Sequence, residues 1–126
     1  MHIAILTDGI QPYVIGGMQR HSFSLAKFLS LNGHQITLVH CVPDKSETLP
    51  TTDDVKREMA LPASSKLETI CLRFPAAGFL PGHYLKESYL YSRKVYAAIE
   101  SSLSTFDFIY AKGFSAWHLL ERKSRE

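Results

Sequence analysis

Two short apolar runs, separated by a loop and a helical pattern, constrain the fold of this chain more than any other feature. The first run, residues 2–7, is nearly continuous in apolar residues, as in a parallel strand covered on both faces. The second, residues 35–42, is rich in β-branched residues and ends at Pro43. Since a helix that joins two parallel strands crosses over right-handed in nearly all proteins, residues 2–42 are predicted to form a βαβ unit.

The segment between the two runs reads as a loop followed by a helix. Two glycines and a proline punctuate residues 8–16, which is typical of a loop. From Met18 to Leu29, small and apolar side chains recur with helical spacing, and Gly33 supplies a C-terminal stop. The first helix is therefore expected to begin directly after a glycine pair.

Strands and helices continue to alternate through the rest of the chain. Strand character returns at residues 66–74 and 106–111, and helices are predicted at 84–103 and 114–122, with a loop at 75–82. This alternation predicts an α/β fold, a Rossmann-like three-layer arrangement with a parallel sheet. The inner face of the long helix is expected to use Leu85, Tyr89, Ser92, Tyr96, Ile99 and Leu103.

Residues 43–65 interrupt this alternation. The stretch is polar and contains several prolines, serines and threonines. A cap near Thr52 would start a short helix that runs to about Ala60. We expect this segment to be a mobile insertion.

Length and composition limit the classes of function. A chain of 126 residues has room for one domain of ordinary size, and 45% hydrophobic residues are enough to bury a core. The net charge is only +2 and the basic residues are scattered, so nucleic-acid binding has little support. No spacing of His, Cys or acidic residues matches a metal site, and no nucleophile–base constellation is visible. Both cysteines are expected to be reduced, and the apolar start is too short for a signal peptide or membrane span, which indicates a cytoplasmic protein.

The glycine pair Gly16-Gly17 is the first candidate binding feature. Glycines before a helix let an anion approach the unpaired N–H groups at its positive end. The spacing is neither a dinucleotide fingerprint nor a phosphate-binding P-loop, so glycines that only permit a turn remain an equal alternative.

Three polar residues flank the same edge of the predicted sheet. Asp8 ends the first strand on the ligand side, and its carboxylate suits hydrogen bonds to a ligand as well as a turn. His21 lies about one turn into the first helix, where it would contact a ligand or remain a surface residue. Lys112 follows the fourth strand and would meet a phosphate or a carboxylate, or remain a solvated loop lysine.

A series of short motifs runs through the first third of the chain: Met1-His2-Ile3-Ala4-Ile5-Leu6-Thr7-Asp8, Pro12-Tyr13, Gly16-Gly17, Gln19-Arg20-His21, Leu25-Ala26, Leu29 and Gly33-His34-Gln35-Ile36-Thr37-Leu38. Together they resemble the opening of the retaining GT-B glycosyltransferases of the fourth sequence family. The resemblance is strong across residues 1–42 and returns more loosely at residues 108–115.

The resemblance implies an enzyme with two Rossmann-like domains facing a cleft. Such an enzyme moves a sugar from a nucleotide-sugar donor to a glycan or lipid-linked acceptor, as in polysaccharide biosynthesis, without a further cofactor. Carried over to this chain, the donor diphosphate would approach Gly16 and Gly17. The acceptor side of the cleft would hold Asp8, Tyr13, Gln19, His21 and, beside the fourth strand, Lys112.

The resemblance also implies that residues 1–126 are an incomplete N-terminal domain of a GT-B architecture. The family's donor-binding domain is not within this sequence, so no catalytic residue is assigned and the chain alone is expected to be inactive. The uncovered sheet edge predicts a homodimer, and the full-length enzyme would associate peripherally with the inner face of the membrane. A self-contained flavodoxin-like binding or regulatory module is the alternative that the length suits.

Overall fold

The computed structural model describes residues 1–14, 16–43, 45–74, 83–113 and 115–124. The loop expected at 75–82 lies outside these residues. The elements, in chain order, are β1 (His2–Leu6), α1 (Gly17–Leu31), β2 (Gln35–Pro43), α2 (Thr52–Glu58), β3 (Leu67–Phe74), α3 (His83–Ile99), the 3-10 helix η1 (Glu100–Thr105), β4 (Phe108–Ala111) and α4 (Trp117–Ser124).

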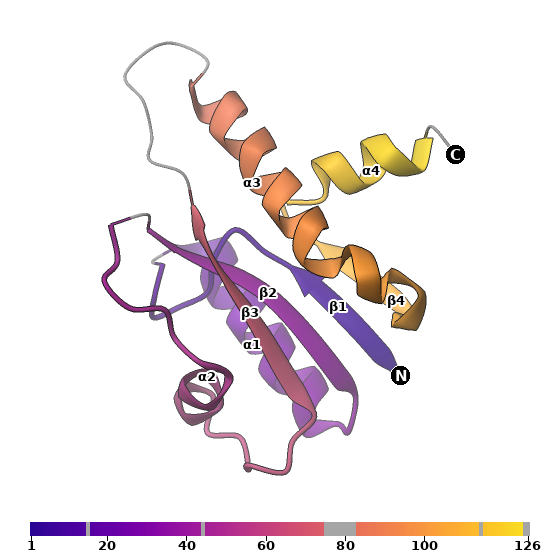
Figure 1. Cartoon of the computed structure of the whole chain (residues 1–126). Coiled ribbons are helices and arrows are strands. Elements are labelled where there is room, and N and C mark those ends of the chain that lie inside the picture. Colours follow the sequence, from indigo (N-terminus) through magenta and orange to yellow (C-terminus); the bar gives the residue numbers. More distant parts are fainter. Residues whose placement is uncertain (15, 44, 75–82, 114, 125–126) are drawn as a thin grey trace.

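The four strands form one parallel sheet in the order β3-β2-β1-β4 (Figure 1). Ile3 in β1 lies opposite Ile36 in β2 and Phe108 in β4. Helices flank the sheet, which confirms the predicted Rossmann-like α/β fold. In a flavodoxin-like sheet β1 would lie between β2 and β3, whereas here it lies between β2 and β4. The flavodoxin-like topology of the alternative is therefore wrong.

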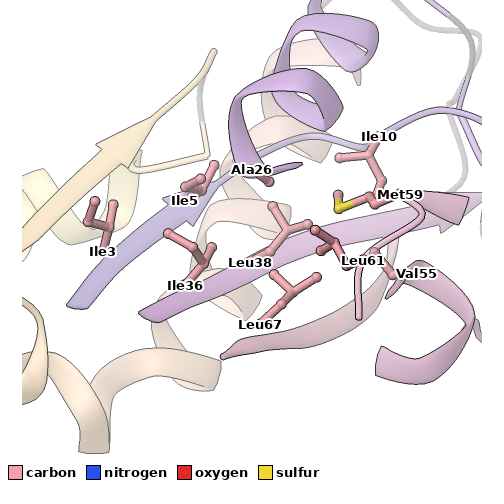
Figure 2. Close-up of a cluster of buried hydrophobic side chains, with 10 residues drawn as sticks. All are labelled: Ile3, Ile5, Ile10, Ala26, Ile36, Leu38, Val55, Met59, Leu61 and Leu67. Atoms are coloured by element: carbon pink, nitrogen blue, oxygen red, sulfur yellow. The ribbon is translucent and has the colours of Figure 1, made fainter. Parts of the chain in front are cut away.

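Helices α1 and α2 cover one face of the sheet. Their core cluster, drawn in Figure 2, contains Ile3, Ile5, Ile10, Ala26, Ile36, Leu38, Val55, Met59, Leu61 and Leu67. Val55 and Met59 are fully buried although they come from the segment expected to be an insertion. Residues 43–65 thus contribute part of the core, and their mobility stays a prediction.

A capping box starts α2. The cap is Thr51, one residue before the expected position: its hydroxyl accepts a hydrogen bond from the Asp54 amide, and the Asp54 carboxylate accepts one from the Thr51 amide. Two of the unpaired N–H groups of this short helix are satisfied in this way. Local sequence therefore fixes where α2 begins, and its buried side chains fix it on the sheet.

Helices α3 and α4 cover the opposite face. The buried face of α3 is formed by Ser88, Tyr91, Ser92, Val95 and Ile99. The expected inner face was therefore wrong at Tyr89, which is half-buried and packs against Trp117 at the start of α4. Tyr96 is half-buried too, and it contacts both the core cluster on this face and His118 of α4. Helix α3 also ends at Ile99 and continues as η1, rather than running to Leu103. Leu85, also expected on the inner face, belongs to the described backbone, but its side chain is not among those described.

Candidate functional site

The chain leaves the adjacent strands β1 and β4 toward opposite faces of the sheet. After β1 it enters α1 on one face, and after β4 it enters α4 on the other (Figure 1). In open α/β sheets, ligands bind beyond the carboxyl ends of the strands at such a switch point. The residues around it, here called the switch-point site, are Asp8, Gly16, Gly17, Gln19, His21, Lys112 and Gly113.

At Asp8 the loop after β1 meets the loop after β4. Its carboxylate accepts a hydrogen bond of 3.4 Å from the side-chain amide of Gln19. Gly113, in the loop after β4, has a φ of 60°, and a side chain there would begin 3.6 Å from the Asp8 carboxylate. The expected neighbours Asp8 and Gln19 are thus in contact, and Gly113 of the loop after β4 lies beside the Asp8 carboxylate.

Lys112 and His21 form a second contact across the site. The Lys112 ammonium group donates to Nδ1 of His21, which joins the loop after β4 to α1. The backbone amide of Lys112 donates to the Leu6 carbonyl at 2.9 Å and so continues the pairing with β1. Because an ammonium group only donates, Nδ1 of His21 is the acceptor in this contact.

The glycine pair stands at the N-terminus of α1. Gly16 is the N-cap residue, no side chain caps the helix, and no acidic residue lies in its first turn. A Cβ on Gly17 would meet no atom within 4 Å, so the backbone there is open, whereas one on Gly16 would lie 2.2 Å from the Gln19 side-chain oxygen. The N-terminus of α1 thus has neither a side-chain cap nor an acidic residue in its own first turn.

Tyr13 lies away from the other expected site residues, on the α2 side of the same loop. It packs against the core cluster under α1 and α2, and its ring centroid is 5.9 Å from that of His40. Burial raises the pKa of the Tyr13 phenol, and the nearby carboxylates of Glu58 and Asp54 raise it further. The phenol therefore stays protonated and can donate a hydrogen bond.

Buried hydrogen bonds that the sequence did not indicate hold the carboxyl end of β1. The Tyr91 hydroxyl donates to the Thr7 carbonyl at 2.6 Å, and the Ser115 hydroxyl donates to the Leu6 carbonyl at 3.1 Å. The Cys41 thiol donates to the Asp8 carbonyl at 3.0 Å. Burial raises the pKa of that thiol to about 12, so it remains a donor. The position of Asp8 is thus fixed from β2, α3 and the loop after β4.

His40 is a further residue that sequence reasoning missed. It lies in the middle of β2, it is fully buried, and neither ring nitrogen has a hydrogen-bond partner in the part of the chain that the structure describes. Burial lowers the pKa of its imidazole to about 4. Its only signal in the sequence is a histidine inside a run of strand-forming residues.

Neither a group of metal ligands nor a similarity to a known protein adds to the description of this site. The described residues contain no group of three or more His, Cys, Asp or Glu side chains that could hold a metal ion, and none of their helices is long and apolar enough to cross a membrane. In comparisons with known proteins, no family model, curated protein or solved structure matches this chain.

Proposed function

We propose that this chain is the acceptor-side portion of a glycosyltransferase that uses a nucleotide-sugar donor. The single observation that supports this most is the uncapped, glycine-flanked N-terminus of α1 at the switch point of a parallel sheet. Backbone N–H groups and the helix dipole at such a terminus favour a phosphate group. The donor diphosphate would bind at Gly16 and Gly17.

The two contacts across the site supply complementary chemistry for an acceptor. Asp8 is held by Gln19 through one carboxylate oxygen, which leaves the carboxylate able to accept hydrogen bonds from sugar hydroxyls. Lys112 brings a positive charge to the opposite loop, where it would pair with a phosphate or carboxylate of the acceptor. These residues bind and orient the substrates, and the sugar transfer itself requires groups from a donor-binding domain.

An amide-resolved titration with pyrophosphate tests the proposal. Pyrophosphate is the shared part of all nucleoside-diphosphate sugars, so the test does not depend on the base or the sugar. We expect saturable, millimolar binding with the largest chemical-shift changes at the amides of Gly17, Met18, Gln19 and Arg20. Changes spread over lysines and arginines elsewhere, without saturation, would contradict the assignment.

The affinity of the same chain for nucleotide sugars separates this proposal from a self-contained binding module. A donor site with only one of its two walls should bind nucleotide sugars weakly, since most of the contacts would come from the other domain. Micromolar or tighter binding by this chain would instead favour the self-contained module.

A further inference from the structure

An open hollow of about 370 Å³ lies between α2 and the segment before it, on the side of Tyr13. We call it the α2 hollow, and its polar lining comes from Tyr13, Ser46, Thr48, Asp54, Arg57 and Glu58. None of these residues except Tyr13 was a candidate site residue from the sequence, because the segment was interpreted as an insertion. The hollow is separate from the contacts that join Asp8, Gln19, His21 and Lys112.

Both walls of the α2 hollow are tied to β3. The Arg73 guanidinium donates to the Ser46 carbonyl, which fixes the segment before α2. The hydroxyls of Thr52 and Thr69 lie 3.0 Å apart, and the Thr69 amide donates to the Thr52 hydroxyl at 3.1 Å. The hollow is thus bounded by segments that are hydrogen-bonded to the sheet, and a ligand there would find its contacts already in place.

The lining of the α2 hollow favours an uncharged ligand rich in hydroxyl groups. Tyr13 offers part of an aromatic ring together with a protonated phenol, a combination that suits a ring with one apolar face and polar edges. The carboxylates of Asp54 and Glu58 outnumber the single guanidinium of Arg57, which is already paired with Asp54. This excess of negative charge disfavours a phosphorylated ligand, whereas carboxylate and hydroxyl oxygens accept hydrogen bonds from sugar hydroxyls.

Glu58 connects the α2 hollow to the glycine loop. It also lines a second open hollow of about 480 Å³ whose lining includes Gly16, Arg20 and Phe23. The side chain of Glu58 therefore stands between the hollow at α2 and the hollow at the N-cap of α1. Two hollows that share one carboxylate match a ligand with two linked units better than a single ring.

We propose that the α2 hollow is a subsite for an uncharged sugar unit of an oligosaccharide acceptor, with the next unit in the second hollow and Glu58 between them. This inference rests on the proposed function for the substrate class. To that class it adds that the acceptor has at least two sugar units and that its outer unit is uncharged. It also assigns Glu58 to contact the linkage between the two units.

The test is an amide-resolved titration of the full chain with neutral sugars. The probes are α- and β-linked disaccharides of glucose, galactose and mannose, the matching monosaccharides, and glucose 6-phosphate as the anionic comparison. We expect at least one disaccharide to bind, with changes at Tyr13, Thr48 and Glu58, about tenfold more tightly than its monosaccharide. No binding by any disaccharide, or binding of glucose 6-phosphate at Tyr13, Thr48 and Glu58 as tight as that of the best disaccharide, would overturn the inference.

Variants of Glu58 and Tyr13 provide a second test of the same inference. Glu58→Gln should weaken the best disaccharide about tenfold, which corresponds to the loss of a charge-assisted hydrogen bond. Tyr13→Leu should weaken it similarly, whereas Tyr13→Phe keeps the ring and most of the affinity. Glu100→Gln, an exposed change in η1, is the matched control and should leave binding unchanged. Unaltered affinity in folded Glu58→Gln would overturn the role of Glu58.

The same protein preparations distinguish failure of this inference from failure of the proposed function. Pyrophosphate is titrated into a parallel sample of each preparation that contains no sugar. If it still perturbs Gly17 to Arg20 while no sugar binds, the subsite is wrong and the donor loop stands. If the sugars bind and pyrophosphate does not, the phosphate assignment is the one that fails.

Discussion

The hydroxyl of Tyr91 in α3 donates a hydrogen bond of 2.6 Å to the backbone carbonyl of Thr7, 84 residues earlier in the chain. This carbonyl lies directly before Asp8, at the point where β1 passes into the loop of the candidate site. A helix on one face of the sheet thereby fixes the start of a loop that leads to the opposite face. The bond ties the stability of the fold to the geometry of the site.

Replacing Tyr91 with phenylalanine should measure this relationship. Tyr91→Phe removes the donor and leaves the buried Thr7 carbonyl without it, so we expect a loss of about 1–3 kcal/mol in the free energy of unfolding. Urea denaturation followed by circular dichroism measures the loss. Tyr96→Phe, in a half-buried tyrosine of the same helix, should change stability by less than about 0.5 kcal/mol. Equal effects in the two variants would show that the bond contributes nothing specific.

His40 should make the fold sensitive to acid. Its folded pKa is about 4, below the unfolded value of 6.5, so the unfolded chain binds the proton more readily. The resulting loss in the free energy of unfolding is absent above pH 6.5, grows as the pH falls, and is complete near pH 4. The difference between the two pKa values corresponds to roughly 3 kcal/mol.

Denaturation curves between pH 7 and pH 4 test this contribution. His40→Leu removes the titrating group from the core and should flatten the pH dependence by most of that amount. His34→Gln, at the turn between α1 and β2, should retain the slope of the original chain. An unchanged slope in His40→Leu would mean that other groups cause the acid sensitivity.

The capping box of α2 should hold part of the core in place. Thr51→Ala removes the hydroxyl that accepts from the Asp54 amide, and such changes cost about 1 kcal/mol. Because α2 and its C-cap residue carry the buried Val55 and Met59, hydrogen exchange should quicken throughout α2 and at neighbouring β3 amides. Ser64→Ala, at an exposed position after α2, serves as the control. Fast exchange of α2 already in the unmodified chain would support a mobile insertion instead.

The edge strand β4 is expected to mediate a homodimer. It pairs only with β1 among the described strands, and Phe108 on it is 56% exposed. Unpaired strand edges with apolar side chains favour association. Light scattering after size exclusion should give twice the monomer mass, and Phe108→Lys should restore the monomer. A monomer at high concentration in the unmodified chain would rule this interface out.

The sequence was most informative where a single pattern had a single explanation. Continuous apolar runs marked β1 and β2, and Gly33 marked the end of α1, because strands buried on both faces and helix stops leave unambiguous local signals. In α3, Tyr89 and Tyr91 both continue a stripe of helical spacing, so local sequence does not say which of them faces the sheet. The packing of α4 decides it: Tyr89 contacts Trp117, whereas Tyr91 is buried in the core cluster.

In the candidate site, too, some positions follow from local sequence patterns and others do not. The positions of Asp8 and Gly17 follow from the βαβ pattern, since both lie at the carboxyl edge of the first strand. The contact between His21 and Lys112, 91 residues apart, depends on the placement of β4 beside β1, which no local pattern encodes. Polar residues in 43–65 suggested a loose insertion, although three apolar side chains within it, Val55, Met59 and Leu61, are core residues.

The central claim is that the N-terminus of α1 binds the diphosphate of a sugar donor, and Gly17→Ala tests it most directly. A methyl group at this position meets no protein atom within 4 Å, so the helix should be as stable as before or slightly more so, while the space that an anion would occupy becomes smaller. The measurement is the dissociation constant for pyrophosphate of the original chain, of Gly17→Ala, and of Ser24→Ala, an exposed change farther along the same helix. We expect Gly17→Ala to bind at least about tenfold more weakly and Ser24→Ala to bind as the original chain does. Equal affinities for all three proteins, with binding intact, would contradict the assignment of this loop as the phosphate site.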